Sequence, residues 1–341
     1  MSTWPSVDQA LADMMAAVFA GHREKLAGAT VVERGSGLWH QVAELGLLRL
    51  TGAAEHGGSG AGWYEAAELM SAAVRSGIRI PLAEHDVLAC WLLEAGGLAA
   101  DRAPRTVCLV DRHGVATHVP WASTAERVVV VWRAGGQYRV TDVAAELLTI
   151  TPGTNLIGEP RDTVSAELPG LPGTAIGPNL VTQLRLKSGL VRAIQVCAAL
   201  DEILRLCIQH VTSRTQFGRP LSKFQGVAHL VSDVAAEAAL ARAATEAALT
   251  AGVTGKWSSP HLEFLVAAAR SCAGHATSVV VRNAHQVHGA IGTTREHRLH
   301  EFTRAALAWR SEFGSMRYWD DVVADTAMHA SAGGLWSLVT E

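Results

Sequence analysis

Lysine is scarce in this chain, and positive charge is not concentrated anywhere. The lysines are Lys25, Lys187, Lys223 and Lys256, and all other basic charge comes from arginine. The formal net charge is −3, and no basic stripe runs along the sequence. A nucleic-acid-binding surface needs concentrated positive charge to neutralise phosphates. The sequence therefore argues against nucleic acid as a partner.

Cysteine is also sparse, and none of the five residues forms a CxxC pair. They are Cys90, Cys108, Cys197, Cys207 and Cys272. An odd, scattered set predicts reduced, buried thiols without a disulfide framework or a zinc site, which favours a cytoplasmic protein. The first residues, MSTWPSVDQALADMM, show no basic region followed by an apolar run, so no signal peptide is expected. No uncharged apolar run approaches the roughly 18 residues of a membrane span.

What the chain does have is 49% hydrophobic residues, enough for a large core. Its hydrophobic period changes twice along the sequence. In residues 1–103, Val7, Leu11, Met14 and Val18 recur at helical spacing, and a second amphipathic stretch covers 63–74. Residues 56–62 (HGGSGAG) between them predict a loop. A tight helix–helix turn is favoured there over a phosphate cradle, because no strand precedes the glycines.

Residues 104–178 have a β pattern. Residues 106–110 and 127–132 (RVVVVW) are rich in β-formers, and Gly135-Gly136 supplies a turn before 137–140. Five prolines between 152 and 178 then indicate a loop-rich segment. We expect a small β domain inserted between two helical domains.

Residues 179–341 return to long helices. A stripe of apolar residues predicts one helix over 190–211, and further helices are expected at about 224–250, 261–285 and 296–313. Four long helices with short connections predict an antiparallel bundle. The expected fold class is thus mainly α with a small β insert.

Two segments of this bundle are more specific than its period. Residues 214–225 read RTQFGRPLSKFQ between the first two helices, and residues 285–292 read HQVHGAIG between the last two, followed by Glu296-His297 and Arg304. Together they resemble the C-terminal domain of the acyl-CoA dehydrogenase family. Near the N-terminus, 42–51 (VAELGLLRLT), with Glu55 and Gly57-Gly58, resembles the family's N-terminal helical domain.

The resemblance implies FAD as cofactor, an acyl-CoA thioester as substrate and a separate electron-transfer acceptor. In the family the first loop reaches the pyrophosphate side of a flavin held mainly by a neighbouring subunit, where a guanidinium and backbone donors suit the phosphates. By resemblance, the cofactor-binding residues are Arg214, Gln216, Phe217, Gln225, Gln286 and Gly289. The alternative at single positions is structural: Arg214 capping a helix end, and the glycines only turning the chain.

The usual catalytic base of the family is missing. Most members carry Glu-Gly-Thr on the last bundle helix, but matching Gly314 to that glycine puts Phe313 where the base should be. Glu312 is adjacent, although one residue turns a side chain by about 100° on a helix. The other location for a base, near the start of the first bundle helix, contains LRLKSG (184–189) and no carboxylate. Glu312 is the candidate catalytic residue, with a surface or capping role as the favoured alternative.

The middle domain departs from the family as well. It is short, and nothing between residues 89 and 132 matches the family's Thr-Glu-Pro…Gly-Ser-Asp stretch beside the flavin ring. Both losses resemble the incomplete subunit of a heterotetramer whose complete partner brings the ring pocket and the base. Such pairs are associated with bulky CoA esters in fatty acid or steroid side-chain β-oxidation.

Two other functions stay open: a non-catalytic structural or regulatory paralogue, and a flavin monooxygenase-type enzyme of the same fold. His288, His297 and His300 gather near one turn, but no paired Cys/His spacing accompanies them. We therefore expect loop or core histidines and no metal site.

Overall fold

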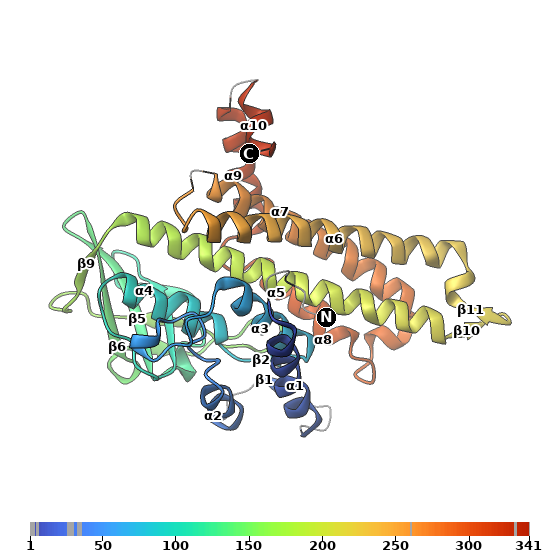
Figure 1. The fold of residues 1–341 in the computed structure, drawn as a ribbon, viewed down its shortest axis with the longest axis horizontal. Helices are drawn as coiled ribbons and strands as arrows, with labels where there is room; N and C mark the ends of the chain where they lie inside the picture. Colours follow the sequence, from blue (N-terminus) through green and yellow to red (C-terminus); the bar gives the residue numbers. More distant parts are fainter. Residues whose placement is uncertain are drawn as a thin grey trace. The chain divides into compact units, whose positions relative to one another are not determined.

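The computed structural model describes residues 4, 7–25, 31–32, 36–259, 261–330 and 333–340. It divides into two compact units, Met1–Lys187 and Ser188–Glu341. The first unit holds the N-terminal helices and strands β1 to β9, and the second holds most of the bundle (Figure 1). The expected fold class, mainly α with a small β insert, is confirmed. The three-part division at residues 103 and 178 stays a prediction.

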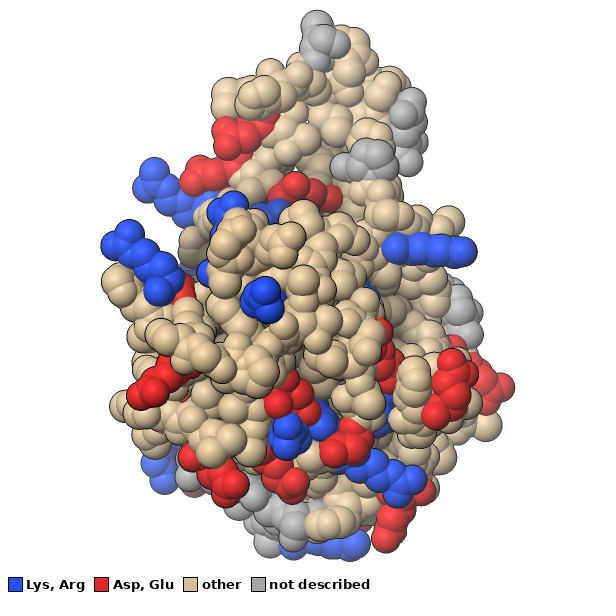
Figure 2. Space-filling view, turned by 90° about the vertical axis from the view of Figure 1, so that its left-hand side faces the viewer, with Lys and Arg blue, Asp and Glu red and all other residues tan. Residues whose placement is uncertain are grey.

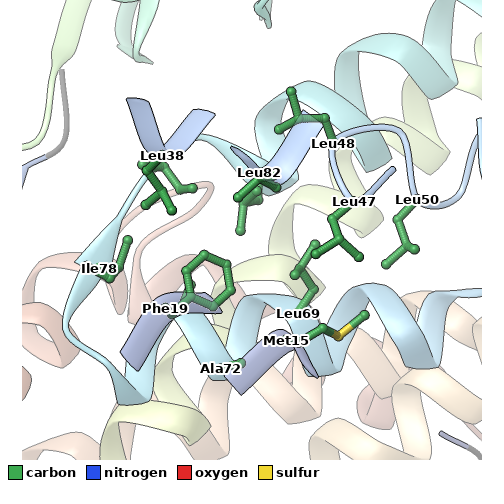
Figure 3. Close-up of a cluster of buried hydrophobic side chains, with 13 residues drawn as sticks. Met15, Phe19, Leu38, Leu47, Leu48, Leu50, Leu69, Ala72, Ile78 and Leu82 are labelled. Atoms are coloured by element: carbon green, nitrogen blue, oxygen red, sulfur yellow. The ribbon is translucent and has the colours of Figure 1, made fainter. Parts of the chain in front are cut away.

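The N-terminal helices are α1 (Gln9–Lys25), α2 (Ser36–Glu44), α3 (Trp63–Arg75) and α4 (Trp91–Ala95), with a short 3-10 segment η1 (Ala54–His56) and a π-helical segment η2 (Glu84–Cys90). Helices α1, α2 and α3 contribute side chains to one apolar cluster. Strands β1 (Val31–Val32) and β2 (Ile78–Arg79) pair in parallel. Figure 3 shows the cluster, in which Met15 and Phe19 of α1 face Leu69 and Ala72 of α3.

The glycine-rich segment 56–62 is a loop, as predicted. Its backbone amides are occupied by the chain itself: Ser59, Gly60 and Ala61 donate to the carbonyls of Arg49, Gly52 and Leu50, respectively. These amides are not directed at a ligand, which supports the helix–helix turn over the phosphate cradle.

Two small sheets, in which most strands pair antiparallel, form the β region. One has the order β3-β5-β6-β9 and the other β4-β8-β7. Their strands are β3 (Arg105–Leu109), β4 (Val115–Pro120), β5 (Arg127–Ala134), β6 (Gln137–Ala144), β7 (Thr149–Thr151), β8 (Arg161–Ser165) and β9 (Thr174–Ile176). The turn at Gly135-Gly136 joins β5 to β6 as expected. Residues 152–178 were predicted to be loop-rich, but they also contain β8 and β9.

The second unit is built from long helices. They are α5 (Pro178–Ser213), which begins in the first unit, α6 (Gln225–Thr254), α7 (Leu262–His288), α8 (Leu299–Trp309), α9 (Met316–His329) and α10 (Gly334–Thr340). Helices α6 and α7 lie side by side, and α9 packs on α7 (Figure 1). The four predicted helices are present, and α9 and α10 follow them. The segment Leu262–Thr293 is long and apolar enough to cross a membrane, but half of its most apolar window is buried inside the unit.

Charged side chains are interspersed on the face shown in Figure 2, where basic and acidic groups alternate without a large patch of one sign. This distribution fits the near-neutral net charge of the sequence.

Candidate functional site

The segment after α5 forms an exposed hairpin. Strands β10 (Thr215–Gln216) and β11 (Arg219–Pro220) pair around Phe217 and Gly218, both with positive φ. The Phe217 ring is 92% exposed and meets the Phe224 ring edge-on at 6.2 Å. The Arg219 guanidinium lies 4.2 Å from the centre of the Phe224 ring. An exposed phenylalanine in a defined loop is a surface suited to contact with another molecule.

The turn after α7 begins at Gly289. Its φ of 63° and ψ of −144° lie in a region that side chains other than glycine rarely adopt. A Cβ at this position would meet nothing within 4 Å, so the backbone is open to close approach. Gln286 on the last turn of α7 is exposed.

The structure brings these two segments to the same end of the second unit. His210 on the last turns of α5 stacks on His288 at the end of α7, with ring centroids 4.5 Å apart. Arg214 follows His210 by one helical turn. Burial lowers the pKa of the His210 imidazole most, the neighbouring histidines lower it next, and the charge of Arg214 adds a smaller decrease. The predicted cofactor-binding residues Arg214, Gln216, Phe217, Gln225, Gln286 and Gly289 are all exposed.

The three-histidine group differs from the one that the sequence suggested. His210, His288 and His297 lie together, whereas the Nδ1 atom of His300 is hydrogen-bonded to the His297 carbonyl oxygen at 2.8 Å. Burial lowers the pKa values of His210, His288 and His297. Sequence proximity therefore identified two of the three members.

Glu312 is held in an ion pair. The Nε atom of Arg192 on α5 donates to its Oε2 atom at 2.8 Å, and both side chains are largely buried. Phe313 has a φ of 53°, and its ring lies 4.8 Å from the Arg192 guanidinium carbon. A carboxylate paired with arginine is stabilised in its charged form, which makes it a weaker proton acceptor. This environment does not favour Glu312 as a catalytic base.

Arg270, which the sequence analysis did not identify, fixes the backbone around Glu312. It is 1% exposed on α7, and its Nη2 atom donates to the carbonyls of Arg310, Glu312 and Gly314 at 2.8–3.2 Å. Burial lowers its pKa to about 9, so the guanidinium is charged at neutral pH. A lone arginine within the apolar sequence LVAAARSCAG was the available signal for a buried structural role.

The second base location, 184–189, contains a buried cation in place of a carboxylate. Lys187 is 1% exposed, and its Nζ atom lies 3.9 Å from the ring centre of Trp91 and 4.9 Å from that of Trp63. Burial lowers the pKa of Lys187 to about 7, while the charge of Asp86 raises it. Burial also raises the pKa of Asp86 to about 7. Both residues belong to the first unit.

Asp86 is a second group that the sequence analysis missed. It lies on η2, and π-helical segments occur often at functional sites. Its Oδ2 atom accepts from the Thr51 amide at 3.0 Å, and its buried Oδ1 atom has no hydrogen-bond partner among the described residues. No local sequence period indicates such a group, because its environment comes from distant segments.

The first unit also contains a cleft of about 760 Å³ beside α2. Its lining combines apolar and charged side chains: Trp39, His40, Ala43, Glu44, Leu48, Ile80, Pro81, Asp101, Arg102, Ala103, Pro104, Thr124 and Glu126. The volume is within the range of small-molecule sites. None of the residues assigned from the sequence lines it.

Comparison with known proteins places these features in a family. Residues 184–327 match the model of the acyl-CoA dehydrogenase C-terminal domain. The chain is 26% identical over 320 residues to acyl-CoA dehydrogenase IpdE2 of Mycobacterium tuberculosis, covering 89% of this chain and 92% of the relative.

Solved structures share the fold over nearly the whole chain. A chain of the ChsE4-ChsE5 complex from Mycobacterium tuberculosis superposes with a TM-score of 0.80 at 20% identity, covering 95% of this chain and 98% of that one. A variant of the Tcur3481-Tcur3483 steroid ACAD gives 0.80 at 19% identity, with 94% and 98% covered. Residues 184–327 therefore form an acyl-CoA dehydrogenase C-terminal domain, and the chain as a whole has the fold of acyl-CoA dehydrogenases.

Proposed function

We propose that this chain is one subunit of a hetero-oligomeric, FAD-dependent acyl-CoA dehydrogenase, and that its partner supplies the base for the α,β-dehydrogenation. The observation that carries the proposal is the state of the base position. Phe313 occupies it, and the adjacent Glu312 is paired with Arg192 at 2.8 Å. A phenyl ring cannot accept a proton, and the paired carboxylate is disfavoured as an acceptor.

The residues assigned to the cofactor fit a flavin dinucleotide. FAD supplies the acceptor for the substrate hydride when bound. The exposed Arg214 guanidinium can donate to a pyrophosphate, and Gly289 leaves the backbone open where a side chain would obstruct it. Gln216, Phe217, Gln225 and Gln286 would complete this contact. All six are exposed on the single chain, which suits a cofactor held largely by a partner subunit.

The relatives support the same arrangement. One structural neighbour comes from a ChsE4-ChsE5 complex and another from a steroid ACAD with two named components. We therefore propose a complete acyl-CoA dehydrogenase subunit as partner, a heterotetramer as the assembly, and a bulky acyl-CoA such as a steroid side-chain intermediate as substrate. A cytoplasmic location and a separate electron acceptor belong to the same proposal.

The competing proposal is that the chain is a structural paralogue that binds no flavin. Such a protein has no need of an arginine for a pyrophosphate, so the Arg214→Gln variant distinguishes the two proposals. We expect this variant, in the assembled enzyme, to retain less flavin without a matching loss of stability. The matched control is Arg317→Gln, which removes an equal charge from a 90% exposed side chain on α9. Equal flavin-to-protein ratios in the two variants, measured from visible absorbance after gel filtration, would contradict the assignment.

A further inference from the structure

His210, His288 and His297 bring three imidazole rings together from three separate parts of the chain. The rings of His210 and His288 are stacked at 4.5 Å, and those of His288 and His297 have centroids 4.6 Å apart. One ligand nitrogen from each lies within 4.8 Å of the other two. His288 is 5% exposed, and the other two are partly buried.

The hydrogen bonds of His288 leave one nitrogen available inside this group. Its Nδ1 atom lies 2.8 Å from the Ala284 carbonyl oxygen, which can only accept, so the Nδ1 atom carries the proton. The Nε2 atom then carries a lone pair. Within the described residues no hydrogen bond of normal geometry reaches this buried atom, although the Leu206 carbonyl oxygen lies close enough to the ring to raise its pKa. An Nδ1–H bonded to a backbone carbonyl is the usual arrangement of a histidine that ligates metal through Nε2.

The electrostatics favour neutral rings. Burial lowers the pKa of all three imidazoles; His288 and His297 also lower that of His210, and His288 and His300 that of His297. Backbone carbonyls beside His288 raise its pKa, but by less than burial lowers it. Neutral imidazole is the form that ligates metal.

We propose that His210, His288 and His297 bind a divalent transition-metal ion of the zinc type. Three histidines with a fourth position for water form a known zinc ligand set. Zinc–nitrogen bonds of about 2.1 Å require nitrogens roughly 3.4 Å apart in a tetrahedral site, so side-chain rotation must draw the rings together. The Leu299 amide donates to the His297 Nδ1 atom at 3.1 Å. Because Nδ1 accepts this bond, the neutral ring carries its proton on Nε2. Ligation through Nδ1 displaces the Leu299 amide, and ligation through Nε2 requires the proton to move to Nδ1, so either way the bond is lost and His297 is the weakest of the three ligands.

The ion would join the end of α5, the end of α7 and the segment that precedes α8. The first two elements carry Arg214 and Gln286, and Gly289 begins the connecting turn, so an ion there would hold the proposed flavin contacts in place. This consequence rests on the proposed function. Metal binding by the three histidines does not, and it can be measured without flavin.

The test is Zn²⁺ binding to the full chain, measured by competition with a chromophoric chelator, together with the visible spectrum of the Co²⁺ complex. We expect one high-affinity site. His210→Ala should weaken Zn²⁺ binding at least tenfold and remove the Co²⁺ band, and His297→Ala should weaken it less. Both side chains are partly exposed, so these variants should fold where His288→Ala could leave a cavity.

His229→Ala is the matched control, because His229 is exposed on α6 and outside the group. Equal Zn²⁺ affinity in His210→Ala and His229→Ala would overturn the proposal, as would a full chain that fails to compete with the chelator. Loss of Zn²⁺ binding in His210→Ala with unchanged flavin content would uphold the metal site and remove its link to the cofactor.

Discussion

Replacement of Lys187 by methionine should stabilise the protein, by an amount that depends on pH. The folded-state pKa of Lys187 is lowered from 10.5 to about 7 because its ammonium group is buried. Above pH 10.5 the amine is neutral in both states, and below pH 7 it is charged in both. Between these values the unfolded chain binds more protons, so stability rises with pH. Methionine has a similar length and no charge to bury.

The magnitude follows from the two pKa values. At pH 7 the buried amine destabilises the native state by about 4 kcal/mol, and at pH 9 by about 2 kcal/mol. Contact of the cation with the Trp63 and Trp91 rings offsets about 1–2 kcal/mol of this, and only while the amine is charged. We therefore expect Lys187→Met to gain about 3 kcal/mol at pH 7, and about 2 kcal/mol at pH 9, where the folded-state amine is neutral and the rings offset nothing.

Urea unfolding followed by tryptophan fluorescence and by circular dichroism measures this difference, provided that the two signals coincide. Lys25→Met is the control, since Lys25 is exposed at the end of α1. A gain that is equal at pH 7 and pH 9, or no larger than that of the control, would refute the account of Lys187. The carboxyl of Asp86 has a raised pKa of about 7, so its effect lies below the pH range in which Lys187 acts: stability falls as pH rises from 3.8 to 7.

Three further substitutions test the packing of the chain. A Cβ at Gly58 would lie 2.1 Å from the Gly52 carbonyl oxygen, so Gly58→Ala should cost at least about 2 kcal/mol in urea unfolding. Gly21 lies in α1, and a Cβ there would meet no atom within 4 Å, so Gly21→Ala should instead stabilise the protein by about 0.5–1 kcal/mol. Equal changes in stability for Gly58→Ala and Gly21→Ala would contradict the packing described for Gly58. Arg270→Met should cost about 3 kcal/mol, because three partly buried carbonyls lose a charged donor. A loss below about 1 kcal/mol would show that water replaces the guanidinium.

The helical period of the sequence predicted where helices lie better than it predicted which face of each helix is buried. Val7, Leu11, Met14 and Val18 indicated a helix, and α1 is present, but its buried residues are Ala12, Met15 and Phe19. Leu11, Met14 and Val18 flank this core as partly buried neighbours. A helix with apolar residues at adjacent positions has a broad apolar face, and its partner α3 decides which row points inward.

The sites depend on contacts that no local pattern contains. Arg192 and Glu312 are 120 residues apart, so the sequence could locate Glu312 beside the base position without indicating its ion pair. His210 joins His288 across many intervening residues, and a search for metal-ligand spacing fails for that reason. The RTQFG and HQVHGAIG segments were informative because both lie within residues 184–327, which match the acyl-CoA dehydrogenase C-terminal domain.

The central claim is that this chain contributes part of a flavin site and that a partner completes it. The most direct measurement is the visible spectrum and native mass of the chain purified alone, and again after co-expression with a complete acyl-CoA dehydrogenase subunit encoded beside it. A colourless chain that becomes a yellow, acyl-CoA-oxidising hetero-oligomer is the predicted result. A yellow homo-oligomer that oxidises acyl-CoA by itself would contradict the claim, and Glu312 would then be the first residue to replace.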